Sequence, residues 1–356
     1  MFPIVFLFLF LLPMKEKISE IKDLLQNPKD IVITVHRSPD ADALGSSLAL
    51  SEVLKQLNHN VTVISPNDYA SFLYWMKGND QVIIYSEDKA KSQKITNNAD
   101  IIFLLDFNSL TRISDYSDVV ENSSAIRIMI DHHQEVDVKA ANVIISDPKS
   151  CSTAQLLFEV LESLNYKHLI NKDVAECLYA GIMTDTGSFK YSSTSSKTHH
   201  IIAELINLGA DNSKIHDLIY DNYSENRTKL LGYCLNQKLQ IFPELNSAII
   251  SLTDEELKKF NFKKGDTEGV VNYALAIKGI IFAVFIAEKE GVVKLSLRSK
   301  GNFKVNKIAK QYFNGGGHIN ASGGTSELSV NKTIEKVILI FKENKINLTK
   351  KSHENY

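Results

Sequence analysis

Residues 32–47, VITVHRSPDADALGSS, place a cluster of polar side chains directly after a short apolar strand. The run Ile31–Val35 is rich in β-branched residues and is followed by a loop, which is the pattern of a strand buried on both faces of a parallel sheet. The loop carries His36, Asp40 and Asp42, and the residues after it have helical spacing. The stretch therefore predicts a strand, a polar loop and a helix in succession.

The same apolar pattern returns along the first half of the chain. Short apolar runs occur in NVTVIS, QVIIYS, ADIIFLLDF, IRIMIDHH and NVIISDP, with helical segments between several of them. Alternating strands and helices of this kind predict an α/β fold with a doubly wound, mainly parallel sheet. Sheets of this type bind their ligands beyond the carboxyl ends of the strands.

The length of 356 residues exceeds one typical core, and the pattern changes twice along the chain. Helical segments dominate from about residue 197, and alternating apolar runs return beyond about residue 240. We expect an N-terminal α/β domain over residues 14–205, a helical linker over 206–240 and a smaller α/β domain over 241–346.

The first 13 residues, MFPIVFLFLFLLP (1–13), are apolar but fall short of the about 20 residues that span a bilayer. They also lack a basic start and a small-residue cleavage site, so we interpret them as an upstream extension or a misassigned start, in preference to a membrane tether. The three cysteines, Cys151, Cys177 and Cys234, are far apart and odd in number, which favours buried thiols in a reducing compartment, the cytoplasm.

Composition narrows the range of partners. The chain is 44% apolar and 23% charged, as globular proteins are, which argues against a fibrous or disordered protein. Its formal net charge of -2 supplies no global basic field, so we expect no long duplex as a partner and allow a short anionic ligand on a local basic patch. Whether the protein forms a homodimer stays open.

Six candidate metal ligands follow the expected ends of strands: His36, Asp40, Asp42, Asp106, His132 and Asp185. The apolar segment before Asp185, CLYAGIM, is taken as a further strand. A single aspartate after a strand is more often a helix N-cap, and Asp42 or Ser46 is a candidate for that role. A helix needs only one cap, whereas this loop carries three potential ligands, His36, Asp40 and Asp42. Without a bound cation, such closely spaced groups would repel one another.

Mixed imidazole and carboxylate donors at one sheet edge are what a two-metal hydrolase needs. The oxygen-rich set favours two divalent cations, Mn²⁺ first, with Mg²⁺, Co²⁺ and Zn²⁺ as alternatives. Such a pair of ions activates a water and stabilises in-line displacement at phosphorus. We expect the hydroxyls of Thr184, Thr186 and Ser188 to donate hydrogen bonds to the ligands.

The second domain contains SLRSKGNFKVNKIAKQYFNGGGHINASGG, which combines basic residues with a glycine run. Arg298 can hold a phosphate through two hydrogen bonds. The run Gly315–Gly317, followed by His318, lets backbone amides approach an anion closely. A flexible turn between a helix and a strand explains the glycines equally well when they are taken alone, and the nearby Arg298 favours phosphate recognition.

Together these motifs resemble the DHH phosphoesterase superfamily. VHRSPDADALGS, Asp106, Asp131-His132-His133 and TDTGSF are similar to the superfamily signature in type and order, and SLRSKG with GGGHINASGG is similar to its associated DHHA1 domain. The resemblance spans about residues 15–345 and is strongest to the NrnA-like subgroup, whose members degrade very short RNAs and often dephosphorylate 3′-phosphoadenosine 5′-phosphate (pAp).

The resemblance implies a role for each matching position. His36 and Asp40 would bind one Mn²⁺, whereas Asp42, His132 and Asp185 would bind the other, and Asp106 would bridge them. His133 would contact the scissile phosphate or orient the site, with Asp131 behind it, so the candidate catalytic residues are Asp106, His133 and Asp131. The substrate's phosphate and nucleotide would be contacted by Arg298, Ser299, Gly315, Gly316, Gly317 and His318.

The implied activity is Mn-dependent hydrolysis of single-stranded oligoribonucleotides of about two to five nucleotides to 5′-mononucleotides, and of the mononucleotide bisphosphate pAp to AMP and phosphate. Two enzymatic alternatives are a phosphodiesterase acting on pGpG or cyclic dinucleotides and a pyrophosphatase similar to the family II enzymes. The GGGH segment argues against the pyrophosphatase. The remaining alternative, an inactive nucleotide-binding sensor, would gain little from keeping six ligands.

Overall fold

The structure, a computed structural model, describes residues 14–289 and 291–350. The chain divides between Asn222 and Tyr223 into two compact units. Within the described residues, no helix has the length and apolar character needed to cross a bilayer. The interpretation of residues 1–13 falls outside the described part of the chain.

The first unit is built on a six-stranded sheet in which every pair of neighbouring strands is parallel. The strand order is β3-β2-β1-β4-β5-β6, with β1 (Asp30–Val35), β2 (Asn60–Ser65), β3 (Ile83–Ile84), β4 (Ile101–Leu105), β5 (Ile126–Asp131) and β6 (Val143–Ser146). This confirms the predicted doubly wound parallel sheet, although the run QVIIYS contributes only the two-residue β3.

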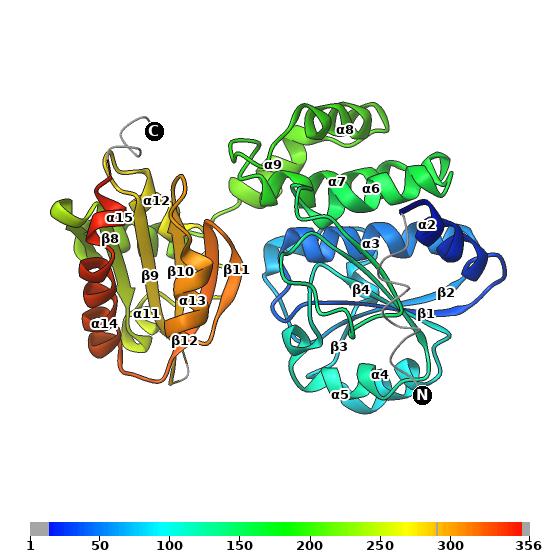
Figure 1. The fold of residues 1–356 in the computed structure, drawn as a ribbon, viewed down its shortest axis with the longest axis horizontal. Coiled ribbons are helices and arrows are strands. Elements are labelled where there is room, and N and C mark those ends of the chain that lie inside the picture. Colours follow the sequence, from blue (N-terminus) through cyan, green and yellow to red (C-terminus); the bar gives the residue numbers. More distant parts are fainter. Residues whose placement is uncertain (1–13, 290, 351–356) are drawn as a thin grey trace. The chain divides into compact units, whose positions relative to one another are not determined.

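Helices cover both faces of this sheet (Figure 1). The helices of the first unit are α2 (Met14–Leu24), α3 (Ala41–Gln56), α4 (Lys89–Asn97), α5 (Ser117–Glu121), α6 (Thr153–Ser163), α7 (Lys172–Asp185), α8 (Ser196–Asn207) and α9 (Asn212–Tyr220), with 3₁₀ turns at Ser71–Leu73, Asn79–Gln81, Leu110–Tyr116 and Lys167–Leu169. Helices α8 and α9 pack against α7. Alternate strand residues point to opposite faces, so Ile33 packs with α3, α6 and α7, whereas Val32 packs on the α5 side.

The register of the central strands sets the position of the polar residues. Val35 pairs with Leu105, and Leu105 pairs with Ile130, so the apolar parts of β1, β4 and β5 end level with one another, and β5 continues by one residue to Asp131. The next residue on each strand is therefore a polar one, at the carboxyl edge of the sheet. Parallel pairing alone brings together groups that are far apart in the sequence.

The segment CLYAGIM before Asp185 was predicted as a strand, and this prediction is wrong, because it lies inside helix α7. A buried helix is apolar on every side, and a short apolar run does not distinguish it from a buried strand. Helix α7 packs tightly on α3: a Cβ at Gly45 would lie 2.4 Å from the carbonyl oxygen of Cys177. Asp185 therefore reaches the carboxyl edge from the end of a helix.

The second unit is a smaller α/β domain around a mixed six-stranded sheet, as predicted for the C-terminal part. Its order is β11-β12-β10-β9-β8-β7, in which only β8 and β9 are parallel, and its strands are β7 (Leu239–Phe242), β8 (Ser247–Leu252), β9 (Phe282–Lys289), β10 (Val292–Ser299), β11 (Gly316–His318) and β12 (Ala321–Ser326). The helices are α10 (Glu225–Tyr233), a π-helical turn (Cys234–Lys238), a 3₁₀ turn (Pro243–Leu245), α11 (Asp254–Lys259), α12 (Val270–Ala276), α13 (Val305–Tyr312), α14 (Val330–Glu343) and α15 (Lys345–Leu348).

Each face of the second sheet has its own core. Ile249, Val284 and Leu295 pack with α13 and α14, and Ile250 and Phe285 pack with α10, α11 and α12. The three cysteines are buried and free, as the sequence predicted.

Candidate metal centre

The six predicted ligands all lie at the carboxyl edge of the first unit's sheet, and the structure sorts them into two groups. His36, Asp40 and Asp106 have ligand atoms within 4.8 Å of one another, as do Asp42, His132 and Asp185. The predicted set is thus brought together by residues from β1, β4 and β5 and by the ends of two helices.

Asp106 belongs to the first group and also faces His132 of the second group. Its Oδ2 is 3.4 Å from Nε2 of His36, and its Oδ1 is 3.5 Å from Nε2 of His132. Each carboxylate oxygen therefore faces a different histidine, which is the arrangement that a carboxylate shared by two cations needs. Asp106 also has a positive φ of 64°, an uncommon conformation for a residue other than glycine, directly after β4.

The first group is completed by Asp40, whose Oδ2 is 3.9 Å from Nε2 of His36. The other ring nitrogen of His36 donates to the carbonyl oxygen of Arg37 at 3.0 Å, which leaves Nε2 as the ligand atom. Asp40 also caps α3, since its Oδ1 accepts from the amides of Asp42 and Ala43. The cap is therefore neither Asp42 nor Ser46, because Asp40 immediately precedes the helix.

The second group surrounds His132. Its Nε2 lies 3.3 Å from Oδ2 of Asp185 and 3.8 Å from Oδ2 of Asp42, and its Nδ1 donates to the carbonyl oxygen of Ser150 at 3.2 Å. The side chain of Asp42 is only 1% exposed, whereas that of Asp185 is 23% exposed and that of Asp40 is 45% exposed. The two more exposed carboxylates mark the side from which solvent reaches the ligands.

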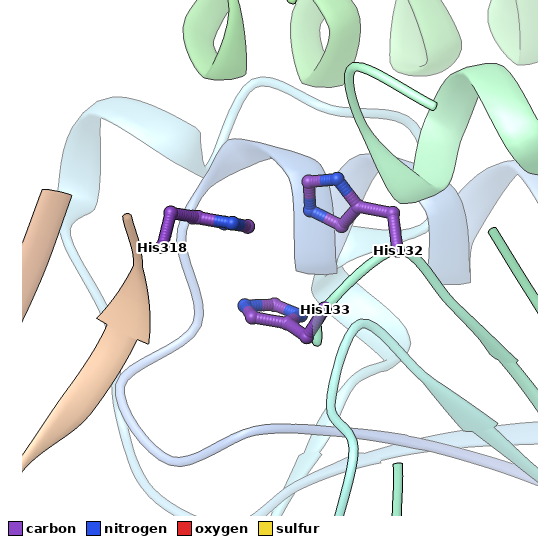
Figure 2. Close-up of side chains that lie close together, drawn as sticks. All are labelled: His132, His133 and His318. Carbon is purple, nitrogen blue, oxygen red and sulfur yellow. The ribbon is translucent and has the colours of Figure 1, made fainter. Parts of the chain in front are cut away.

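His132 and His133 follow one another at the end of β5, with ring planes at 69° and centroids 4.9 Å apart (Figure 2). The Nδ1 of His133 donates to Oδ1 of Asp131 at 2.7 Å and lies 3.8 Å from Oδ1 of Asp106. Asp131 is fully buried, and its Oδ2 accepts no hydrogen bond from the residues that the structure describes. Asp131 therefore holds the His133 ring beside the two groups.

Crowding of buried carboxylates dominates the electrostatics of the centre. Burial, followed by the like charges of Asp42, Asp40, Asp185 and Asp131, holds the pKa of Asp106 well above its ordinary value. Burial and then the charge of Asp40 raise the pKa of Asp42 to about 7. Burial, with His133 nearby, lowers the pKa of His132 to about 4, so this ring is neutral near pH 7.

These observations fit a divalent cation centre. The rings of His36 and His132 present Nε2 to the carboxylates, because their Nδ1 atoms are held by backbone carbonyl oxygens. The negative charges around the buried Asp106 repel one another, and bound cations would relieve that repulsion. Oxygen donors predominate over nitrogen donors, which suits the harder divalent ions.

Sequence reasoning missed the hydrogen-bond donors around the ligands. The hydroxyl of Thr153 donates to Oδ1 of Asp106 at 2.8 Å, and the amides of Thr153 and Ala154 donate to Asp42 at 2.6 and 2.8 Å. The hydroxyls of Thr184 and Thr186 were predicted to donate to the ligands. They donate to carbonyl oxygens within α7. The hydroxyl of Ser188 lies 3.4 Å from Nε2 of His216.

In the second unit, the predicted substrate residues lie around β10, β11 and β12. Arg298 is half-buried on β10, and its guanidinium donates to the carbonyl oxygen of Leu297 at 3.0 Å. The hydroxyl of Ser299 is turned inward: it donates to the carbonyl oxygen of Phe303 at 2.5 Å and accepts from Asn320. His318, the last residue of β11, is also drawn in Figure 2.

The glycine run is partly explained by packing within the second unit. A Cβ at Gly315 would lie 2.0 Å from the carbonyl oxygen of Gly323, and one at Gly317, where φ is 132°, would lie 2.7 Å from that of Ala321. At Gly316 a Cβ would meet nothing within 4 Å. Of the three glycines, Gly316 is therefore the one that close packing within the second unit does not require.

Comparison with known families agrees with the fold and the centre. The model of the DHH family, N-terminal domain, matches residues 30–182, and that of the DHHA1 domain matches residues 246–343. The chain is 40% identical to a solved structure of an exopolyphosphatase-related protein from Bacteroides fragilis, covering 94% of this chain and 98% of that one with a TM-score of 0.90.

Curated relatives point the same way. The bifunctional oligoribonuclease and PAP phosphatase NrnA of Bacillus subtilis is 29% identical over 83% of this chain and 88% of its own length. The probable bifunctional oligoribonuclease and PAP phosphatase NrnA of Streptococcus mutans is 30% identical over 83% of this chain and 89% of its own length. The fold and these matches define a metal-dependent phosphoesterase. The chain belongs to the DHH/DHHA1 superfamily and, within it, to the NrnA-like subgroup.

Proposed function

We propose that the protein hydrolyses short single-stranded oligoribonucleotides, of about two to five nucleotides, to 5′-mononucleotides and converts pAp to AMP and phosphate. The observation that carries this proposal is the position of Asp106, whose two oxygens face histidines of two separate donor groups. The names of the B. subtilis and S. mutans relatives support the two substrate classes.

Two divalent cations, Mn²⁺ by preference, are the proposed cofactors. His36 and Asp40 would hold one, Asp42, His132 and Asp185 the other, and Asp106 would contact both. When bound, such ions promote deprotonation of the attacking water and neutralise negative charge on the phosphoryl group.

The side chains around the donors would position the substrate. Asp131 accepts from Nδ1 of His133 and so leaves Nε2 of that ring to contact the scissile phosphate. Burial of Asp42 and Asp106 keeps bulk water from screening the charges that develop. In the second unit, the proposed substrate contacts are Arg298 and the backbone amides at the glycine run, with His318, whereas the inward hydrogen bonds of Ser299 support a structural role.

A side-by-side turnover profile tests this function. Metal-replete protein is assayed with Mn²⁺ on pAp, dinucleotides, longer RNA, cyclic dinucleotides and pyrophosphate. We expect cleavage of dinucleotides and pAp with little turnover of longer RNA or pyrophosphate. Preferred cleavage of cyclic dinucleotides would favour an activity like that named for the cyclic-di-AMP phosphodiesterase GdpP of B. subtilis, which is 26% identical over 48% of its own length.

The control is a variant that loses the shared carboxylate. Asp106→Ala should abolish hydrolysis of each substrate and leave the protein folded. Absence of turnover of every dinucleotide and of pAp by the metal-replete wild type would refute the proposed function.

A further inference from the structure

One short segment, Ser150–Ala154, contacts ligands from three other parts of the first unit. The carbonyl oxygen of Ser150 accepts from His132 at 3.2 Å, and the amides of Thr153 and Ala154 donate to the two oxygens of Asp42 at 2.6 and 2.8 Å. The hydroxyl of Thr153 donates to Oδ1 of Asp106 at 2.8 Å. The segment thus links β5, α3 and β4 through hydrogen bonds to their candidate ligands.

The segment is itself held in place by buried hydrogen bonds. Ser152 caps α6, since its hydroxyl accepts from the amide of Gln155 at 3.0 Å, and the hydroxyl of Ser150 donates to the carbonyl oxygen of Ser152 at 2.9 Å. The thiol of Cys151 donates to the side-chain oxygen of Gln155 at 3.0 Å. Ser152 and Thr153 are fully buried, so these donors are ordered by the fold and not by a ligand.

Thr153 acts on the carboxylate whose orientation matters most. Asp106 can serve both donor groups only while Oδ1 faces His132 and Oδ2 faces His36. Rotation of this carboxylate about its Cβ–Cγ bond would turn both oxygens away from the histidines. The Thr153 hydroxyl, 2.8 Å from Oδ1, opposes that rotation.

We propose that Thr153 is a positioning residue, which fixes the orientation of the Asp106 carboxylate so that one oxygen is presented to each cation. The inference deepens the proposed function and rests on its two-cation centre. Removing the hydroxyl should weaken metal binding, because partners of metal ligands typically contribute about 10–100-fold to metal affinity.

The test is a Mn²⁺ titration without substrate, by calorimetry, on the metal-free full-length protein. Thr153→Val removes the hydroxyl at nearly constant volume and should weaken Mn²⁺ binding about 10–100-fold, whereas Thr153→Ser should bind like the wild type. Thr34→Val is the matched control: Thr34 is also fully buried in the first unit, and its hydroxyl has no hydrogen-bond partner among the described residues. It should leave the affinity unchanged.

A second pair keeps the test decisive if Thr153→Val fails to fold. Thr153→Ser and Thr153→Ala differ only in the hydroxyl, so the serine variant should bind Mn²⁺ about 10–100-fold more tightly than the alanine variant. Electron paramagnetic resonance at two equivalents of Mn²⁺ should show exchange-coupled ions in the serine variant and uncoupled ions in the variants without a hydroxyl.

Equal Mn²⁺ affinity and equal spectra with and without the hydroxyl would overturn the proposal. Because no substrate is present, the outcome is independent of the turnover profile. Loss of affinity in Thr153→Val together with no hydrolysis of oligonucleotides would leave the positioning role standing and refute the proposed function.

Discussion

Gly181 couples helix packing to the candidate metal centre. A Cβ at this residue of α7 would lie 2.8 Å from Oδ1 of Asp42, 2.8 Å from Cβ of Ala154 and 3.1 Å from Cα of Asp42. The added methyl group must therefore displace either the carboxylate or the start of α6. Gly181→Ala should weaken Mn²⁺ binding by about tenfold or more, because Asp42 loses its alignment.

The effect on stability follows from two opposing contributions. Alanine is favoured over glycine in a helix interior by about 1 kcal/mol, whereas inserting a methyl group into a well-packed core costs about 1–3 kcal/mol. The free energy of unfolding of the metal-free protein should therefore fall by up to about 2 kcal/mol. Trp75, the single tryptophan, lies in the first unit, so its fluorescence during urea denaturation reports the unfolding of that unit.

Gly232→Ala provides the control. Gly232 lies in α10 of the second unit, and a Cβ there would meet nothing within 4 Å. This variant should leave both the Trp75 transition and the Mn²⁺ affinity unchanged. If Gly181→Ala also matched the wild type in both measurements, the claimed contact between α7 and the Asp42 carboxylate would be refuted.

Two further predictions concern the glycine run and pH. Gly316→Ala should leave the free energy of unfolding within about 1 kcal/mol of the wild type and should raise KM without changing Mn²⁺ affinity. Gly317→Ala, at a φ of 132°, should lower the free energy of unfolding by about 1–3 kcal/mol. An unchanged KM in Gly316→Ala would remove Gly316 from the proposed substrate contacts. Since burial and Asp40 raise the pKa of Asp42 to about 7 in the metal-free protein, cation binding below that pH must displace a proton, and Mn²⁺ affinity should rise with pH between about 6 and 8. Calorimetry in buffers of different ionisation enthalpy measures the released protons, and an affinity independent of pH would contradict the assigned pKa.

The carboxyl edge could be predicted from sequence because its signal is local. β-branched runs followed at once by His36, Asp106 or Asp131 identify both a buried strand and the polar residue at its end. In a parallel sheet those ends are brought level by pairing, as Val35, Leu105 and Ile130 are.

Other features depended on contacts that sequence spacing does not encode. Asp185 was assigned to a strand end because α7 is buried on all sides and so lacks the polar face that marks most helices. Thr153 was missed because the run SCSTAQ shows only the cap at Ser152, while the partner of the next hydroxyl, Asp106, lies 47 residues earlier in the chain. The close approach of α7 to Asp42 likewise depends on Gly181, and a helical glycine has no distinctive signal for packing.

The most direct test of the account is the number of Mn²⁺ ions bound per chain, measured by equilibrium dialysis with metal analysis on the wild type and on Asp106→Asn. We expect two ions per wild-type chain, exchange-coupled in the paramagnetic resonance spectrum, and loss of that coupling in Asp106→Asn. A single ion per wild-type chain, or two ions whose coupling survives in Asp106→Asn, would contradict the shared role of Asp106.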